Sequence, residues 1–426
     1  FETTSRLLFW SSYLLTLDQA EQTRLRKEVT AFPPEKVSSL EDLQHWPRLK
    51  QVLCEALRLY PPVPVMLRRA LGPVTIIAGE QVARDDARAE LERLRVCLDA
   101  RLATVPDAKD ASAQADLGVT GVMGHPGVAA AIRDSAVCLI VGTRLAVTAR
   151  AGLDEALAGV ATVSVGVAPP FVPCAHVPAG DLRVVLARLA AAVETRSAGR
   201  TDAPLASLQP PSCQADGVRY RDVVAALDAA LPDDADIVVD AGNTGAAAIH
   251  QLPARPGGRF VVALGMGGMG YSFGAGVGIA FARNRRTVVI AGDGAFFMHG
   301  MEIHTAVQYR LPITFVLLNN NAHAMCVTRE QLFYEGAYSY NRFSPSRLGA
   351  GLAQMFPSLP SLDVTAVGEL PAALERALGV AGPAVVSIEC AADEMPPFAP
   401  FITALQHVSP PIGNTKGIRT DVAASA

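Results

Sequence analysis

The sequence predicts an α/β protein with two parallel-sheet, three-layer domains preceded by a mostly helical segment. From about residue 88 to 195, short β-branched runs alternate with Ala-rich segments of helical length. The same alternation returns between 216 and 400 with near-continuously apolar strands, as expected for strands buried on both faces of a parallel sheet. These patterns divide the chain into a helical segment, a domain, a linker, a second domain and a tail, at 1–75, 85–195, 196–215, 216–400 and 401–426.

The first segment is predicted to form a helix, a loop and a second helix. Its apolar residues recur near helical spacing, at Leu7, Leu8, Trp10, Leu14, Leu15 and Leu17. A proline-rich run at 60–64 then interrupts the helical pattern, because proline lacks the N–H that a helix interior needs.

Strands are predicted where β-branched and apolar residues form short runs. In the first domain such runs lie at 137–142 and 161–165. In the second domain they lie at 236–240, 287–291, 313–318 and 383–389. Between the domains, Ser197, Gly199, Pro204, Pro210 and Pro211 are typical of a linker.

Composition excludes several classes of protein. Half of the residues are hydrophobic and 18% are charged, and 37 Lys and Arg against 41 Asp and Glu give a net charge of −4. A disordered chain would be far more polar, and a nucleic-acid-binding chain would carry a basic field. The seven cysteines form no CxxC pair, so we expect neither a zinc site nor a disulfide framework, and a reducing cytoplasm is the simplest location.

One uncharged stretch, 260–282, is long enough to span a bilayer. It contains seven glycines, which weaken an isolated helix, although Gly270, Gly274 and Gly278 imitate a small-residue membrane face. Because the stretch lies midway through an α/β pattern, we expect no membrane span.

The strongest chemical signal is Gly292-Asp293-Gly294 after one apolar strand, followed 24 residues later by Asn319-Asn320 after the next. Adjacent parallel strands deliver their ends to one edge of the sheet, where ligands bind. Carboxylate and amide oxygens suit Mg²⁺, which completes its shell with phosphate oxygens and water. The two glycines let the backbone approach those phosphates, because they have no Cβ. The alternative to a magnesium and phosphate site is that these residues form ordinary turns at the strand ends.

At these residues the sequence resembles the thiamine diphosphate enzymes of the acetolactate synthase and benzoylformate decarboxylase type, over about 88–400. The resemblance implies that Asp293, the side chain of Asn320 and the backbone carbonyl of Ala322 are Mg²⁺ ligands. It also implies that this region begins after a junction with the preceding helical segment, within residues 71–90. The first α/β domain would then lack its first strand and glycine turn.

The resemblance further implies a cofactor site and a substrate pocket. The implied cofactor-binding residues are Asn243, Thr244, Gly267, Gly268, Met269, Gly292, Gly294 and Ala295. Met269 would support the bent cofactor, whereas Asn243 and Thr244 replace a Gln-His pair common in acetolactate synthases. His323, Met325 and Cys326 are pocket candidates, with ordinary helix packing as the alternative for Met325 and Cys326.

Residues 1–75 resemble part of a haem-thiolate monooxygenase (cytochrome P-450). The acid-alcohol pair Glu2-Thr3, the ExxR pair Glu55 and Arg58, and Arg68 as a propionate partner carry this resemblance. A haem also needs a cysteine in a Phe/Gly-rich loop, and the run ending at Cys174 lacks the glycines. We therefore expect no haem. FAD is not expected either, because the strand-end turn at 141–144 carries no specific fingerprint for it.

The expected function is thiamine diphosphate and Mg²⁺ binding with carbon–carbon bond chemistry on a small 2-oxo acid. The catalytic glutamate of the family lies in a pyrimidine-binding domain that we do not find here, so the activity is expected to be incomplete unless a separate chain supplies that domain. A folded chain is expected to form a homo-oligomer. A non-catalytic fusion remnant is the first alternative, and a haem-dependent monooxygenase is the second.

Overall fold

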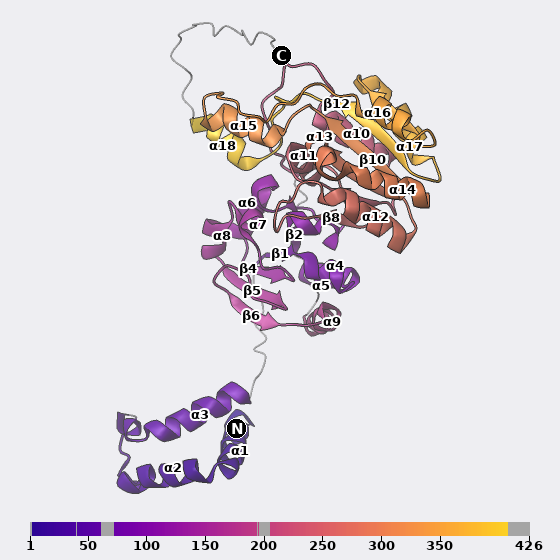
Figure 1. The fold of residues 1–426 in the computed structure, drawn as a ribbon. Helices are drawn as coiled ribbons and strands as arrows, with labels where there is room; N and C mark the ends of the chain where they lie inside the picture. Colours follow the sequence, from indigo (N-terminus) through magenta and orange to yellow (C-terminus); the bar gives the residue numbers. More distant parts are fainter. Residues whose placement is uncertain (1, 40, 61–71, 194, 196–204, 408–426) are drawn as a thin grey trace. The chain divides into compact units, whose positions relative to one another are not determined.

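A computed structural model describes residues 2–39, 41–60, 72–193, 195 and 205–407 (Figure 1). The chain divides into an N-terminal unit, Phe1–Arg69, and a main unit, Ala70–Ala426. The described residues of the main unit form two six-stranded sheets. The predicted fold class, two parallel three-layer domains after a helical segment, is therefore confirmed.

The described residues of the N-terminal unit form three α-helices, one more than predicted. They are α1 (Glu2–Leu17), α2 (Gln19–Ala31) and α3 (Pro47–Leu59). The apolar residues from Leu7 to Leu17 that predicted the first helix all lie in α1. Asp18 follows α1, and its side chain accepts a hydrogen bond from Glu21 N and thereby caps α2. Two short 3-10 helices, Pro34–Lys36 and Glu41–His45, connect α2 to α3.

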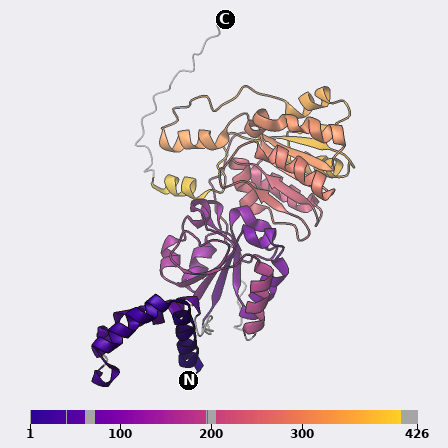
Figure 2. The same cartoon turned by 60° about the horizontal axis from the view of Figure 1, so that its bottom comes forward.

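The first sheet of the main unit is parallel, in the order β3-β2-β1-β4-β5-β6. Its strands are β1 (Val74–Ala78), β2 (Arg101–Thr104), β3 (Gly118–Val119), β4 (Val137–Val141), β5 (Ala161–Gly166) and β6 (Ala175–Pro178). The runs predicted at 137–142 and 161–165 are β4 and β5. Helices cover the sheet, as Figure 2 shows, and include α4 (Glu80–Arg84), α5 (Arg88–Leu98), α6 (Gly127–Arg133), α7 (Val147–Arg150), α8 (Asp154–Ala158) and α9 (Leu182–Ala192). Two 3-10 helices lie among them, η3 (Pro106–Ala111) and η4 (Gly121–Met123).

The expectation of a missing first strand is wrong. Strand β1 lies in the middle of the first sheet, pairs with β2 and β4, and is buried along its whole length. The strand is followed by Gly79, where a Cβ would lie 2.2 Å from Thr143 Cβ, so only glycine fits at this position between β1 and α4. The β-branched run Val-Thr-Ile-Ile-Ala at 74–78 is typical of a strand. It was not assigned to the domain because it lies within 71–90, where the junction was expected.

The second sheet is also parallel, in the order β11-β12-β10-β9-β7-β8. Its strands are β7 (Asp236–Val239), β8 (Phe260–Val262), β9 (Thr287–Gly292), β10 (Ile313–Asn319), β11 (Ser361–Val364) and β12 (Ala384–Glu389). All four predicted strands occur here, as β7, β9, β10 and β12. The α-helices are α10 (Tyr220–Ala230), α11 (Asn243–Gln251), α12 (Tyr271–Arg283), α13 (Asp293–His299), α14 (Ile303–Tyr309), α15 (Ala324–Phe333), α16 (Leu348–Met355), α17 (Leu370–Leu378) and α18 (Ala399–His407).

Helix α18 corrects the predicted tail. The predicted boundary at 400 falls inside this helix, because the aromatic residues Phe398 and Phe401 pack against each other and Phe401 is buried. The rest of the predicted tail, 408–426, lies outside the described residues.

The uncharged stretch 260–282 consists of strand β8, a glycine-rich turn and most of helix α12. None of the helices in the described part of the chain is long and apolar enough to cross a membrane. The glycines therefore belong to a tight turn and to a helix that packs against β7 and β9 of the second sheet.

Buried basic groups connect the two sheet domains. Lys109, in η3, donates from Nζ to the carbonyls of Ile249 and Leu252 at the end of α11, at 2.6 and 2.5 Å. His125, which follows η4, stacks on His250 of α11 with ring centroids 4.2 Å apart. These contacts hold the carboxyl end of α11 against the first sheet domain.

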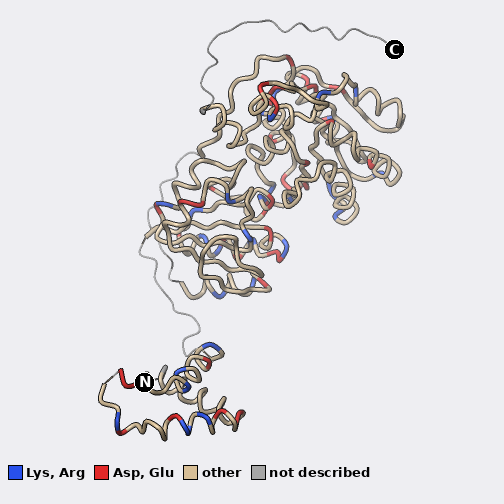
Figure 3. Tube along the Cα trace, turned by 60° about the vertical axis from the view of Figure 1, so that its left-hand side comes forward, with Lys and Arg blue, Asp and Glu red and all other residues tan. Residues whose placement is uncertain are grey.

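Within the part of the chain that the structure describes, charged residues do not form a field of one sign. In Figure 3, basic and acidic residues are interspersed along the described trace. This distribution agrees with the small net charge of −4.

Candidate functional site

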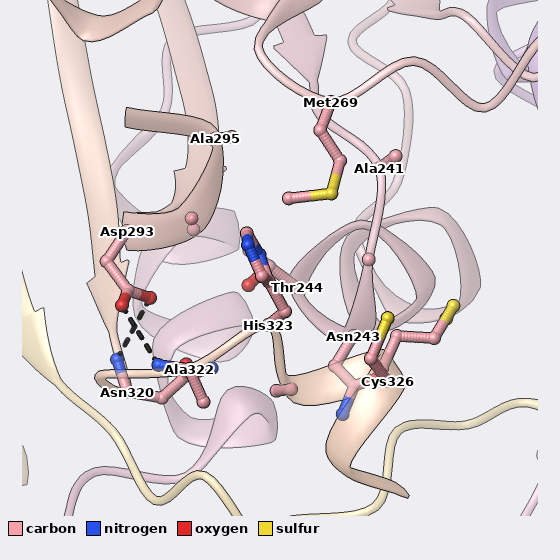
Figure 4. A pocket seen from close by; sticks show the side chains of 15 residues that line it. Ala241, Asn243, Thr244, Met269, Asp293, Ala295, Asn320, Ala322, His323 and Cys326 are labelled. Atoms are coloured by element: carbon pink, nitrogen blue, oxygen red, sulfur yellow. Dashed lines mark hydrogen bonds between the residues drawn. The ribbon is translucent and has the colours of Figure 1, made fainter. Parts of the chain in front are cut away.

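A pocket opens at the carboxyl ends of β7, β9 and β10 (Figure 4). Parallel strands bring together residues that are far apart in the sequence at this edge, where ligands of α/β sheets bind. The pocket is lined by Ala241, Gly242, Asn243, Thr244, Met269, Gly292, Asp293, Gly294, Ala295, Asn320, Ala322, His323, Ala324, Met325 and Cys326.

Asp293 is the polar centre of the pocket. It is the first residue of α13, directly after β9, and its residue is fully buried. Its Oδ1 accepts from Asn320 N at 3.3 Å and its Oδ2 from Ala322 N at 3.1 Å, as the dashed lines of Figure 4 show. Burial raises the pKa of Asp293 to about 6, although the surrounding backbone N–H groups favour the charged form.

Asn320 and Ala322 follow β10, the strand next to β9. Asn320 Oδ1 accepts from Ala322 N at 3.1 Å, the same nitrogen that donates to Asp293. The amide oxygen and the carboxylate are therefore neighbours. The strand pattern predicted that Asp293 and Asn320 converge, and the resemblance implied Ala322 as a third ligand. The structure brings the three residues together.

The start of helix α11 forms another side of the pocket. Gly242 has φ +106°, a conformation that favours glycine, and it turns the chain from β7 into α11. Asn243 and Thr244 begin the helix and both line the pocket. Asn243 Nδ2 donates to Thr328 Oγ1 and to the carbonyl of Glu394, each at 3.3 Å. Its buried Oδ1 has no partner among the described residues.

Met269 and His323 narrow the pocket. In Figure 4 the Met269 side chain points toward His323 and Thr244. A Cβ on Gly294 would lie 2.6 Å from His323 Nδ1 and 3.2 Å from Met269 Cε, so both side chains fill the space over this glycine. His323 Nδ1 is buried without a partner among the described residues, and burial lowers the pKa of His323.

Some predicted residues lie elsewhere. Gly267 and Gly268 are absent from the pocket lining, whereas Ala295, Met325 and Cys326 belong to it. Glu55 and Arg58 form a bidentate ion pair on α3 of the N-terminal unit, with oxygen–nitrogen distances of 2.6 and 2.7 Å. The Glu2 and Thr3 side chains and all of Arg68 lie outside the described residues.

Three supporting residues were missed by the sequence reasoning. Asp240, at the end of β7, accepts from Gly270 N and Ser272 N, each at 3.0 Å, and thereby caps α12. Tyr220 accepts from Asn320 Nδ2 at 3.1 Å, and Glu394 accepts from Tyr220 N. Only Asp240 carried a signal, as a carboxylate at a strand end. Tyr220 and Glu394 are far from their partners in the sequence.

The donor set fits a hard cation. Among the described residues, no cluster of three His, Cys, Asp or Glu side chains could hold a metal, so soft or histidine-rich sites are not indicated there. The pocket instead offers the buried Asp293 carboxylate, which forms no ion pair with a described Lys, Arg or His, together with the Asn320 amide oxygen. A Cβ on Gly292 would have no atom closer than 3.6 Å, which leaves room for a ligand beside Asp293. Oxygen ligands of this kind suit Mg²⁺ with phosphate.

Comparison with protein families supports the interpretation of the pocket. Residues 240–388 match the family described as thiamine pyrophosphate enzyme, C-terminal TPP binding domain. This range contains every residue that lines the pocket. Residues 1–82 match cytochrome P-450, and the end of that range includes β1 of the first sheet. Both resemblances predicted from the sequence are confirmed.

Individual relatives point in the same direction. A protein of Mycobacterium tuberculosis described as an acetolactate synthase large subunit is 32% identical over 196 residues, which cover 44% of this chain and 34% of the relative. The large subunit of Escherichia coli acetolactate synthase isozyme 2 is 33% identical over 159 residues, covering 37% and 29%. The chain thus spans about a third of the length of these relatives.

A solved structure shares the fold. It is a protein from Mycobacterium smegmatis described as a thiamin diphosphate-dependent enzyme, with a TM-score of 0.60 and 23% sequence identity. The match covers 75% of this chain and 62% of that chain. At this identity the likeness concerns the fold alone.

Proposed function

We propose that the chain binds thiamine diphosphate together with Mg²⁺ in the pocket at the ends of β7, β9 and β10, and takes part in acetolactate synthase-like or 2-oxo acid decarboxylase-like carbon–carbon bond chemistry. The observation that carries the proposal is the convergence of Asp293, Asn320 and Ala322 from two adjacent strands. The likeness of residues 240–388 to a thiamine pyrophosphate-binding domain supports it.

Each side of the pocket has a separate task in this proposal. Mg²⁺ would be held by the Asp293 carboxylate, Asn320 Oδ1 and the Ala322 carbonyl. The diphosphate would lie against the start of α11, where the N–H groups of Asn243 and Thr244 and the helix dipole favour an anion. Gly292 leaves the space that the diphosphate needs.

When bound, thiamine diphosphate supplies a carbon nucleophile and stores an electron pair while a 2-oxo acid loses carbon dioxide. Met269 would support the cofactor, and His323, Met325 and Cys326 would line the space for the small 2-oxo acid. His323 Nδ1, which lacks a described partner, is available for a hydrogen bond to the substrate. A homo-oligomer and a cytoplasmic location remain predictions from the sequence.

Calorimetric titration of the full chain with thiamine diphosphate, with Mg²⁺ and with EDTA, tests the binding. We expect one site that requires Mg²⁺. Asp293→Ala should weaken binding by about 100-fold or more, because it removes the charged ligand. Glu389→Gln is the matched control, since this carboxylate ends the neighbouring strand β12 and accepts from Asn319 Nδ2 outside the pocket. Unchanged affinity in Asp293→Ala would contradict the metal site.

A second assay tests the chemistry separately. The loaded chain is incubated with pyruvate or with benzoylformate, and release of carbon dioxide is measured against Asp293→Ala. Cofactor binding without release from either substrate would contradict the catalytic half of the proposal and leave the binding half in place.

A further inference from the structure

Asn320 can serve a cation only if its amide is turned the right way. The amide group has an oxygen that ligates cations and an NH₂ group that does not, and the two are similar in shape. The orientation of this side chain therefore decides whether the pocket presents an additional ligand or an unfavourable donor.

Tyr220 contacts the NH₂ end of this amide. The Tyr220 hydroxyl accepts from Asn320 Nδ2 at 3.1 Å, while Oδ1 accepts from Ala322 N at 3.1 Å beside Asp293. Reversing the amide would place the NH₂ group against the Ala322 N–H, two donors facing each other. The observed orientation satisfies both ends and leaves the oxygen beside the carboxylate.

Tyr220 is itself held firmly. It is the first residue of α10, and only 2% of its surface is exposed. Its backbone N–H lies 3.1 Å from each oxygen of the Glu394 carboxylate, which is also buried. The Glu394 carbonyl in turn accepts from Asn243 Nδ2 at 3.3 Å. This buried network therefore supports Asn320 and Asn243 from behind, on two sides of the pocket.

We infer that Tyr220 is a positioning residue that orients the Asn320 amide so that its oxygen faces the cation. The inference rests on the proposed function, because the cation is the one that the proposal places beside Asp293. It predicts that the Tyr220 hydroxyl contributes to cation affinity without touching the cation.

Binding of Mn²⁺ in the presence of thiamine diphosphate, measured by electron paramagnetic resonance, tests the inference. Tyr220→Phe keeps the ring and removes the hydroxyl, and we expect Mn²⁺ affinity to fall about 10- to 100-fold, the usual effect of losing a group behind a metal ligand. Thr314→Val is the control for a lost buried hydroxyl. Thr314 lies near the start of β10, and its hydroxyl donates to the Ala377 carbonyl outside the pocket. This variant should bind Mn²⁺ as the wild type does.

A second background separates orientation from general stability. In Asn320→Asp both terminal atoms are oxygens, so there is no amide to orient, and adding Tyr220→Phe should change Mn²⁺ affinity by less than about 2-fold. An equal loss in both backgrounds, or no loss in Tyr220→Phe alone, would overturn the inference, as would abolition of Mn²⁺ binding by Asn320→Asp alone. Failure of the wild type to bind thiamine diphosphate and Mn²⁺ would instead overturn the proposed function, and this inference with it.

Discussion

The two glycines that flank Asp293 have different tasks. A Cβ on Gly294 would lie 2.6 Å from His323 Nδ1, so this glycine allows a side chain of the protein to pack closely. A Cβ on Gly292 would have Thr244 Oγ1 as its nearest neighbour, at 3.6 Å. Gly292 lines the pocket, and its φ of −85° is accessible to any residue. The space at Gly292 is therefore available to a ligand.

Gly292→Ala should separate folding from binding. We expect the free energy of unfolding to change by less than about 1 kcal/mol, because the backbone conformation suits alanine. Affinity for thiamine diphosphate with Mg²⁺ should fall about tenfold or more, because the added methyl group would clash with the diphosphate and weaken the binding free energy by about 1–3 kcal/mol. Urea unfolding and calorimetric titration measure the two quantities.

Gly294→Ala is the comparison variant, and it should lower the stability of the chain without any ligand, because His323 would have to move. Wild-type cofactor affinity in Gly292→Ala would contradict the placement of the diphosphate against this glycine.

The site residues that sequence reasoning found share one property. Asp293 and Asn320 lie at the ends of strongly apolar strands, so their position followed from the strands and their chemistry from their side chains. Tyr220 and Glu394 could not be found in this way. Tyr220 is 100 residues from Asn320 and Glu394 is 174 residues from Tyr220, and only the packed fold brings them together.

At the scale of elements, helix α12 depends on a carboxylate from another strand. Its N-cap, Gly270, has φ +83° and no side chain to cap the helix. Asp240 at the end of β7 replaces the missing cap, with Oδ1 accepting from Gly270 N and Oδ2 from Ser272 N. Because Asp240 is buried, these hydrogen bonds to a charged group are protected from water.

Asp240→Asn should therefore destabilise the chain markedly. The amide keeps one acceptor oxygen and turns an NH₂ group toward a backbone N–H, so we expect a loss of about 2–3 kcal/mol in the free energy of unfolding, measured in urea. Asp181→Asn is the matched control, because Asp181 caps α9 through Arg183 N at an exposed position. Its loss should stay below about 1 kcal/mol. Equal losses in the two variants would contradict the bridging role of Asp240.

The strands that the sequence predicted are those formed by a continuous run of apolar residues. Strands β9 and β10 are continuous apolar runs and were found within a residue or two. Strand β6 is short and mostly exposed, and β11 contains Ser361 and Asp363, so neither has the apolar run of a buried strand. In the N-terminal unit the sequence prediction named no apolar positions between Leu17 and the proline-rich run, and α2, which lies there, has no buried residues.

At the scale of the main unit, the two sheet domains are joined through histidines that need to be neutral. His250 Nδ1 lies 2.9 Å from the Met123 carbonyl, and its Nε2 accepts from Leu208 N at 3.1 Å, so the ring carries one proton. His125 Nδ1 accepts from Val119 N at 3.0 Å. Burial, together with the nearby His250 and Lys109, lowers the pKa of His125 to about 3. Burial also lowers the pKa of His250.

This arrangement should make the joint between the two domains sensitive to acid. Below the ordinary histidine pKa of about 6.5, residue 125 is protonated in the unfolded chain but stays neutral in the folded chain. The free energy of unfolding therefore falls by about 1.4 kcal/mol for each pH unit, down to the pKa of His125 in the folded chain. His125→Asn removes this response, because an asparagine oxygen can still accept from Val119 N but cannot be protonated. Burial raises the pKa of Asp293 to about 6 and that of Glu394 to about 7, so these two groups stabilise the folded chain as the pH falls. Both groups are present in the wild type and in His125→Asn, so their effect cancels in the comparison. Lowering the pH from 7 to 5 should therefore reduce the free energy of unfolding of the wild type by about 2 kcal/mol relative to that of the variant. Urea unfolding at both pH values without ligand measures it, and a difference that stays constant would show that His125 is protonated in the folded chain as readily as in the unfolded one.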